Sequence, residues 1–166
     1  TILPTDVSIS RFAGKEVRAL TNLMILKDSS APYTRKAIVQ WIDTIRTKNM
    51  APDLGAQNNI KYGNSPIEIV KDWTTVVEDG YLTLRFRTYF SDRGTHVVSL
   101  VKGTNPYEVV LHHDAKGDMG GEVRDGIVAF KLNDLPDTHG QTVDLTLKWE
   151  SFSGPKSVKF KYRSRH

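Results

Sequence analysis

The residues with the widest chemical repertoire in this sequence lie close together. They are the run Leu111-His112-His113-Asp114, with Asp118 shortly after it and His96 upstream. Imidazole and carboxylate groups bind zinc and transfer protons, so this region is the first candidate for a functional site.

The strands expected around these residues place two histidines on one face of a hairpin. Residues 95–102 and 107–113 flank a turn signal at Gly103-Thr104-Asn105-Pro106. A hairpin that turns there sets His96 directly opposite His113, with Cβ atoms about 4.5–5.5 Å apart. Two imidazoles at that distance could share a metal ion.

Two interpretations of this cluster are open. In the first, His96 and His113 bind a metal, with Asp114 or Asp118 completing the ligand shell. In the second, the histidines cap the edge of the core and bond to backbone carbonyls or to Asp118. A catalytic metal site usually shows three ligands at recognisable spacing, and this sequence does not. We therefore expect His96, His113 and Asp118 to be structural, with no metal and no cofactor.

Other polar clusters give weaker indications of chemistry. The carboxylate pairs Glu78/Asp79 and Asp134/Asp137 lie among turn residues, and a glycosidase needs two carboxylates across a cleft. The glycine-rich run 117–121 lacks the Lys-Ser/Thr of a phosphate loop, so we interpret it as a connection between strands. We predict that the protein is not an enzyme and has no catalytic residue.

Composition narrows the class of protein. The 166 residues are 39% hydrophobic and 25% charged, which is typical of a globular chain, and contain no cysteine for disulfides or thiolate chemistry. No apolar run reaches the roughly 18 residues that span a bilayer. The net charge of +4 is small, and the lysines near the end alternate with apolar residues as on an edge strand, so nucleic acid is an unlikely partner. We expect the three tryptophans, Trp41, Trp73 and Trp149, to anchor the core.

The second part of the chain shows the period of two that marks half-buried strands. From Tyr81 to Phe90, Leu82, Leu84 and Phe86 alternate with polar residues. Similar alternation or apolar runs separated by turn signals predict further strands near 66–71, 95–102, 107–113, 126–132, 143–150 and 158–163, with Ser91-Asp92-Arg93-Gly94 as one of the turns. About seven short strands predict an antiparallel β-sandwich.

The first part of the chain is harder to interpret. A strand is plausible within Val17–Leu26. Residues 35–48 are ambiguous, because Ile38, Ile42 and Ile45 fit helical spacing while alternate residues fit a strand; periodicity slightly favours the helix. Residues 49–65 are rich in Asn, Gly and Pro and are expected to form a loop.

Several segments of the sequence, taken together, resemble those of a known family. They are Gly63-Asn64-Ser65-Pro66-Ile67-Glu68-Ile69, Asp72-Trp73, Gly80-Tyr81-Leu82-Thr83-Leu84-Arg85-Phe86, Leu111-His112-His113-Asp114 and Gly117-Asp118. The combination resembles the NigD-like family of cell-envelope lipoproteins from Gram-negative anaerobes, over roughly residues 16–165.

The resemblance implies an all-β fold with a small N-terminal OB-like barrel, residues 1–62, followed by a C-terminal β-sandwich, residues 63–166. It implies that 35–48 is a strand, against its helical spacing. It also implies a signal peptide and a lipid-bearing cysteine upstream, and hence a periplasmic or outer-membrane address with a lipid anchor as the only membrane contact. The function expected is non-enzymatic binding of a protein or glycan, with bacteriocin immunity and then metal-dependent hydrolysis as alternatives.

Overall fold

The chain forms two compact units. The computed structural model describes residues 2–5, 12, 14–27, 32, 34–91 and 94–165, so the predicted turn residues Asp92 and Arg93 lie outside the described residues. The units are Thr1–Thr47 and Lys48–His166. The division precedes the expected boundary at 62/63, because residues 48–62 pack with the second unit. No helix in the described parts of the chain has the length and apolarity to cross a membrane.

The first unit contains a three-stranded sheet of order β1-β3-β2. Its strands are β1 (Ile2–Pro4), β2 (Ala19–Ile25) and β3 (Arg35–Thr44), followed by the short β4 (Thr47–Lys48). Strand β1 is parallel to β3, and β2 is antiparallel to it. The strand predicted for 35–48 is therefore confirmed, while an OB-like barrel stays a prediction because the described strands form an open sheet.

A β-bulge explains why residues 35–48 resemble a helix in sequence. Trp41 pairs with Asn22 but Val39 pairs with Leu23, so Gln40 is an extra residue in β3. An extra residue shifts the alternation of faces by one position. Apolar residues on one face are then spaced by three residues across the bulge and by two elsewhere, and this mixed spacing imitates helical periodicity.

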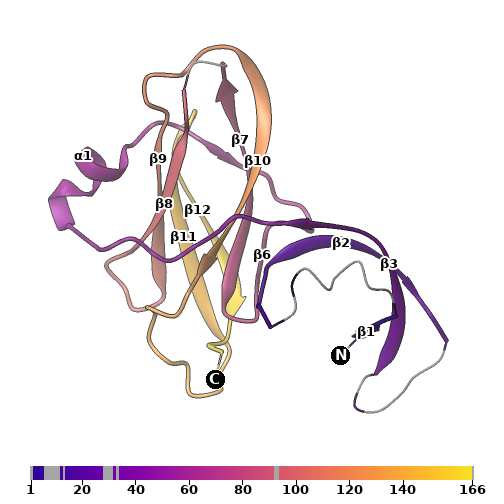
Figure 1. Cartoon of the computed structure of the whole chain (residues 1–166). Coiled ribbons are helices and arrows are strands. Elements are labelled where there is room, and N and C mark those ends of the chain that lie inside the picture. The colour runs from indigo at the N-terminus through magenta and orange to yellow at the C-terminus, as the bar shows by residue number, and fades with distance from the viewer. Residues whose placement is uncertain are drawn as a thin grey trace. The chain divides into compact units, whose positions relative to one another are not determined.

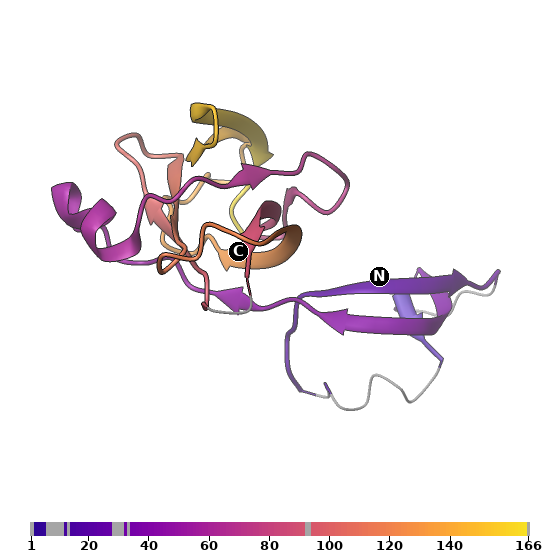
Figure 2. The same cartoon turned by 90° about the horizontal axis from the view of Figure 1, so that it is seen from above.

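The second unit is a β-sandwich, as predicted. One sheet has the order β4-β10-β7-β5, with β6 also paired to β7, and the other has the order β12-β11-β9-β8. Strands β6 to β12 are labelled in Figure 1, and Figure 2 shows the same unit from above. Their bounds are β5 Glu68–Ile69, β6 Val76–Glu78, β7 Tyr81–Phe90, β8 Val97–Lys102, β9 Glu108–Asp114, β10 Glu122–Lys131, β11 Val143–Ser151 and β12 Gly154–Tyr162.

One strand pair of the sandwich is parallel. Strands β9 and β11 pair in parallel, with Leu147 opposite Val109, whereas β7 is antiparallel to β5, β6 and β10, β11 to β12, and β8 to β9. The chain leaves β9, adds β10 to the opposite sheet and returns as β11. Because it crosses between the sheets twice, β11 runs in the same direction as β9.

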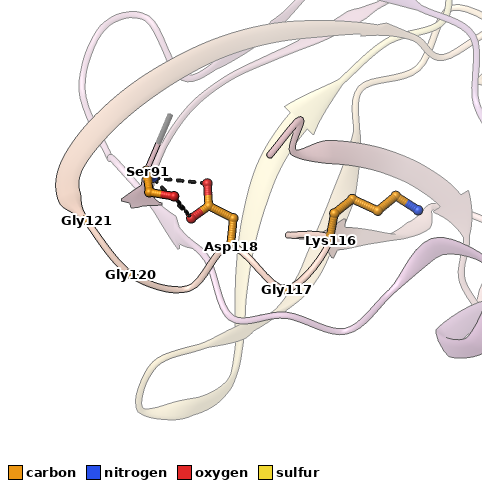
Figure 3. Close-up of a pocket in the computed structure, with 6 residues that line it drawn as sticks. All are labelled: Ser91, Lys116, Gly117, Asp118, Gly120 and Gly121. Carbon is orange, nitrogen blue, oxygen red and sulfur yellow. Dashed lines mark hydrogen bonds between the residues drawn. The ribbon is translucent and has the colours of Figure 1, made fainter. Parts of the chain in front are cut away.

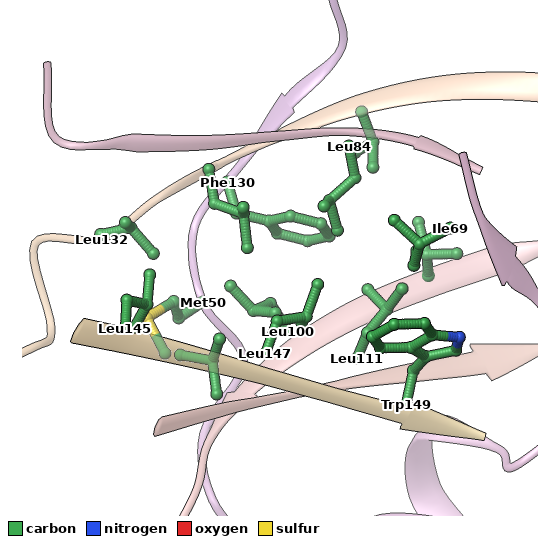
Figure 4. Close-up of a cluster of buried hydrophobic side chains, with 14 of the residues drawn as sticks. Met50, Ile69, Leu84, Leu100, Leu111, Phe130, Leu132, Leu145, Leu147 and Trp149 are labelled. Atoms are coloured by element: carbon green, nitrogen blue, oxygen red, sulfur yellow. The ribbon is translucent and has the colours of Figure 1, made fainter. Parts of the chain in front are cut away.

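The core is the apolar layer between the two sheets. Figure 4 shows Leu84 and Phe130 from one sheet pointing toward Leu111, Leu147 and Trp149 from the other. The alternation predicted for β7 is confirmed, since Leu82, Leu84 and Phe86 are all buried in this cluster. The two sheets therefore pack together through the alternating apolar side chains that are visible in the sequence.

Only one of the three tryptophans is a core anchor. Trp149 is 4% exposed, but Trp41 is 47% exposed and Trp73 is 77% exposed, so the prediction was wrong for these two. Trp41 follows the bulge at Gln40, which turns it to the exposed face of β3. Trp73 lies in the turn between β5 and β6, where the alternation of buried and exposed side chains found in strands does not apply.

A short helix is fastened to the outside of the sandwich by a close backbone contact. A 3-10 turn, Gly55–Gln57, leads into α1 (Asn58–Tyr62), which ends at Gly63 with φ +81°. A Cβ atom at Gly63 would lie 2.6 Å from the His113 carbonyl oxygen and 2.7 Å from the Asp114 Cα atom. Only glycine permits this approach of the helix end to β9.

The contact at Gly63 predicts a large effect of adding one methyl group. Gly63→Ala must push α1 away from β9 and adopt an unfavourable φ, so we expect a loss of about 3 kcal/mol or more in unfolding free energy. Gly117 has φ +82° but open space around it, and Gly117→Ala should cost about 1–2 kcal/mol. Urea denaturation of both variants measures the difference. Equal losses would show that the close approach is unimportant.

Candidate functional site

The structure brings together the three residues singled out in the sequence. His96 precedes β8, His113 lies on β9, and Asp118 lies in the loop between β9 and β10. His96 Nδ1 is 2.8 Å from His113 Nε2, and His96 Nε2 is 3.3 Å from Asp118 Oδ2. All three side chains are almost completely buried.

The predicted register of the hairpin was wrong by two residues. Val98, not His96, lies opposite His113. The loop is closed by a bond from the Gly103 amide to the Glu108 carbonyl, and the buried Glu108 carboxylate accepts bonds from Thr104 and Asn105. The turn is therefore centred one residue later than predicted. A shift of two residues keeps every side chain on its face, so the two histidines still meet.

The ring and carboxylate atoms that would bind a metal are occupied by other contacts. His113 Nδ1 faces the carbonyl oxygens of Ser65 and Pro66, at 3.3 and 3.2 Å. Asp118 accepts hydrogen bonds from the Ser91 amide and hydroxyl (Figure 3). No three His, Asp or Glu side chains of the described residues are grouped to hold an ion. The contacts with backbone carbonyls and with Asp118 are those of the second interpretation given above.

The arrangement of Ser91, Asp118 and His96 also does not activate a nucleophile. In a catalytic triad the serine hydroxyl donates to a histidine, which takes its proton. Here the Ser91 hydroxyl donates to the Asp118 carboxylate at 2.5 Å, and the histidine lies on the far side of that carboxylate. The Ser91 hydrogen bond holds the pKa of Asp118 below its usual value, so this carboxylate is a weak base.

The hydrogen bonds of the cluster determine how many protons it holds. His113 Nδ1 faces only acceptors and must carry a proton, and the contact between the two rings needs one more. With these two protons the His113 ring is neutral and protonated at Nδ1, and its Nε2 accepts from His96 Nδ1.

His113 makes folding stability depend on pH. Burial, together with the neighbouring His96, lowers the pKa of His113 below its ordinary value of 6.5. Below about pH 6.5 the His113 side chain therefore binds a proton in the unfolded chain but not in the folded protein. Stability from this residue is present above that pH and is lost as the pH falls, by at most about 1.4 kcal/mol per pH unit.

We expect thermal denaturation between pH 7.5 and 5 to show this loss in the native protein. His113→Gln should flatten the dependence, at some cost in stability at pH 7.5 because the bond to His96 is disturbed. His139 is exposed in a turn, so His139→Gln should leave the pH dependence unchanged. A slope that survives His113→Gln would assign it to other groups.

The hollow beside Asp118 offers few groups to a ligand. It has a volume of about 440 Å³ and is lined by Ser91, Lys116, Gly117, Asp118, Gly120 and Gly121 (Figure 3). The Asp118 oxygens are occupied by Ser91 and His96, and the Lys116 ammonium pairs with Asp114. The predicted connection role of the glycine-rich loop agrees with this geometry.

The two carboxylate pairs considered in the sequence lie in turns. Asp79 has φ +49° in the turn between β6 and β7, and its carboxylate is 3.6 Å from Arg165. Asp137 accepts hydrogen bonds from the Ser164 hydroxyl and the His139 amide. Neither pair faces a described hollow with free oxygens on both carboxylates.

Sequence reasoning missed an exposed surface on the outer side of β7 and β10. We name it the Trp73 face: Arg85, Arg87, Tyr89, Val123 and Asp125 share one side of β7 and β10, and the turn that carries Trp73 is joined to it by the pair of Asp72 with Arg85. The turn that carries Trp73 is held in place because Asp72 accepts bonds from the Thr74 amide and hydroxyl and from Arg85. These bonds and the ion pair also keep the pKa of Asp72 low.

A charge network crosses the middle of the Trp73 face. Asp125 on β10 bonds both Arg85 and Arg87 on β7, at 2.5 and 2.6 Å, and these contacts, Arg87 foremost, lower its pKa to about 2. Beyond the network, Tyr89 packs edge-on against Phe152, with ring centroids 5.4 Å apart. The alternation of β7 could have indicated Arg85, Arg87 and Tyr89, but Trp73 lay in a turn that periodicity does not describe.

Comparison with known proteins places the chain in a family. Residues 49–162 match the family model of the NigD-like C-terminal beta sandwich domain. The chain belongs to the NigD-like family. The matched range agrees with the second compact unit rather than with a boundary at 62/63. The comparison with curated proteins gives no match.

Solved structures share the fold of nearly the whole chain. A protein from Parabacteroides distasonis described as toxin-related is 32% identical, with a TM-score of 0.85 over 98% of this chain and 81% of that one. A NigD-like immunity protein from Bacteroides caccae is 20% identical, with a TM-score of 0.63 over 89% and 76%. A protein from Bacteroides fragilis described as a lipoprotein is 11% identical, with a TM-score of 0.55 over 99% and 89%.

Proposed function

We propose that this NigD-like protein is a non-enzymatic binding protein of the cell envelope and that its Trp73 face contacts a protein partner. The observation that carries the proposal is the exposure of Trp73 on a turn that hydrogen bonds hold in place. Its side chain is 77% exposed, while its neighbours Asp72 and Thr74 are fixed by hydrogen bonds. A turn that is ordered before binding loses little backbone entropy when its exposed aromatic residue makes contact.

The composition of the face favours a protein partner over other classes. Trp, Tyr and Arg dominate the energetics of protein interfaces, and here they share one surface with the half-exposed Val123. The Arg85 and Arg87 guanidinium groups are balanced by the Asp72 and Asp125 carboxylates. The face therefore has no excess charge to attract nucleic acid or an anionic membrane.

Binding rather than catalysis is supported by the state of the polar cluster. The histidines and Asp118 satisfy one another and the surrounding backbone, and the Ser91 hydroxyl faces a carboxylate instead of a base. Such a cluster stiffens the connections between strands, as its burial and hydrogen bonds require. It supplies neither an activated nucleophile nor an open metal position.

The partner-binding role can be tested by photo-crosslinking in cells that make the full-length protein. Val123→p-benzoylphenylalanine lies within the Trp73 face and Lys71→p-benzoylphenylalanine lies two residues before Trp73, while Asp134→p-benzoylphenylalanine lies in the turn after β10. We expect a discrete protein adduct from the first two positions and none from the third. The adduct should disappear when Trp73→Ala is added, because an interface Trp contributes about 2 kcal/mol or more.

A folding control separates loss of binding from loss of structure. Trp73 is so exposed that Trp73→Ala should change the unfolding free energy by no more than about 0.5 kcal/mol. An adduct that persists in Trp73→Ala, or equal adducts from all three positions, would contradict the proposal.

Localisation in the cell envelope is the second element of the proposal. It is supported by membership of the NigD-like family and by the fold shared with the Bacteroides fragilis lipoprotein. We expect the full-length protein to incorporate labelled palmitate at a cysteine upstream of residue 1 and to sediment with membranes. Cys→Ser at that position should abolish both; a protein that stays with membranes without the lipid would be anchored by another means.

Toxin immunity is a second candidate for the function. It is favoured by the shared fold with the Bacteroides caccae immunity protein and by the relative described as toxin-related. In that case the protein partner of the Trp73 face would be the toxin itself. Deletion of the gene would then sensitise cells to a toxin made by the same strain, and the Trp73→Ala protein would not restore protection.

A further inference from the structure

A second hollow differs from the one beside Asp118 in the state of its polar groups. It lies on the outer side of the β12-β11-β9-β8 sheet, where α1 stands beside β9 (Figure 1), and has a volume of about 340 Å³. That volume is at the lower end of the range of small-molecule sites, about 300–1,000 Å³. The residues that matter for its chemistry are Asn59, Asn64, Val110, His112, Glu150 and Ser157.

The sheet register builds the floor of this hollow. Val110 on β9, Lys148 on β11 and Ser157 on β12 follow one another across three adjacent strands. His112 and Glu150 lie two residues further along β9 and β11 and so face the same side. Asn59 on α1 and Asn64 just after it form a wall, held to β9 by the backbone contact of Gly63.

Most polar groups of the hollow have no partner within the protein. The side chains of Asn59, Asn64, Glu150 and Ser157 make no hydrogen bond or ion pair with another described residue. His112 is buried, and its Nδ1 donates to the Gly63 carbonyl at 3.1 Å, which leaves Nε2 as an acceptor in the neutral ring. Two amides, a hydroxyl, an imidazole and a carboxylate thus converge with unused hydrogen-bonding capacity.

The charges around the hollow define the class of ligand. The two lysines that line it are already paired, Lys148 with Glu108 at 2.9 Å and Lys156 with Glu68 at 3.0 Å. The Glu150 carboxylate is the remaining charge, and it disfavours an anion. Hydroxyl groups can donate to the carboxylate and imidazole and accept from the amides, whereas a cation satisfies the carboxylate alone.

We propose that this hollow is a binding site for a neutral saccharide of one or two rings. The sugar would lay an apolar C–H face on Val110 and direct its hydroxyls to Asn59, Asn64, His112 and Glu150. The site involves none of the residues of the Trp73 face. It is therefore independent of the protein partner proposed above, and either proposal can fail alone.

The test is a titration of the ¹⁵N-labelled protein with maltose, cellobiose, lactose and chitobiose, followed by NMR. We expect at least one disaccharide to shift amide resonances of residues 110–112, 148–150 and 157. Asn64→Ala and Glu150→Gln should each weaken that binding about tenfold, the effect of losing one hydrogen bond to a neutral or charged group. Both side chains lack protein partners, so melting temperatures should not change.

Matched controls and a cationic probe complete the experiment. Asn133→Ala and Asp134→Asn remove the same two groups from an exposed turn and should leave sugar binding unchanged. Spermidine should not shift the resonances of the hollow. The proposal is overturned if no disaccharide shifts them, if Asn64→Ala and Glu150→Gln bind as tightly as the native protein, or if spermidine binds there in place of the sugars.

Discussion

The apolar layer between the two sheets is the contact on which the rest of this protein depends. Each fully buried leucine in it contributes roughly 1.5–3 kcal/mol relative to exposure, and Leu82, Leu84, Leu100, Leu145 and Leu147 are all inaccessible to solvent. At one edge the sheets are also joined directly, by a bond from the Ile67 amide to the Glu150 carbonyl and by the pair of Lys156 with Glu68. Every surface described above is carried by strands that this layer holds in register.

The polar groups of the sandwich divide into two kinds. Around Asp118 they satisfy one another, because buried donors and acceptors without partners would cost more free energy than folding could offset. The hollow next to α1 is different, since the side chains of Asn59, Asn64, Glu150 and Ser157 can reach water and remain available to a ligand. This contrast separates structural chemistry from binding chemistry more clearly than residue type does. His96 and His113, the two histidines that the sequence proposed as metal ligands, have ring nitrogens that already contact other protein groups.

The alternating pattern of the sequence was sufficient to predict the sandwich. In β7 and β11, large apolar residues alternate with mostly polar ones, so the face that packs into the core was predictable, although Tyr81 and Thr83 on the other face of β7 are buried as well. The face of His96 and His113 was predictable for the same reason, even though the register was not. The turn was misplaced because Glu108 and its bonds to Thr104 and Asn105 close the loop one residue later than the Gly-Pro signal suggests. In β3 the bulge at Gln40 gave the apolar residues of a strand a spacing that resembles helical periodicity.

The sequence alone determined that this is a mostly β chain with a C-terminal sandwich, because side-chain alternation follows directly from strand geometry. The NigD-like family was indicated by the resemblance of particular segments. Only the tertiary structure decided which polar groups are free. Whether His112 or His113 keeps an open nitrogen depends on backbone carbonyls almost fifty residues earlier in the chain, at Gly63, Ser65 and Pro66. The exposure of Trp73 likewise depends on a turn held by Arg85 from another strand. Contacts between distant segments have no periodic signal in one sequence, so the candidate binding surfaces emerged only from the folded chain.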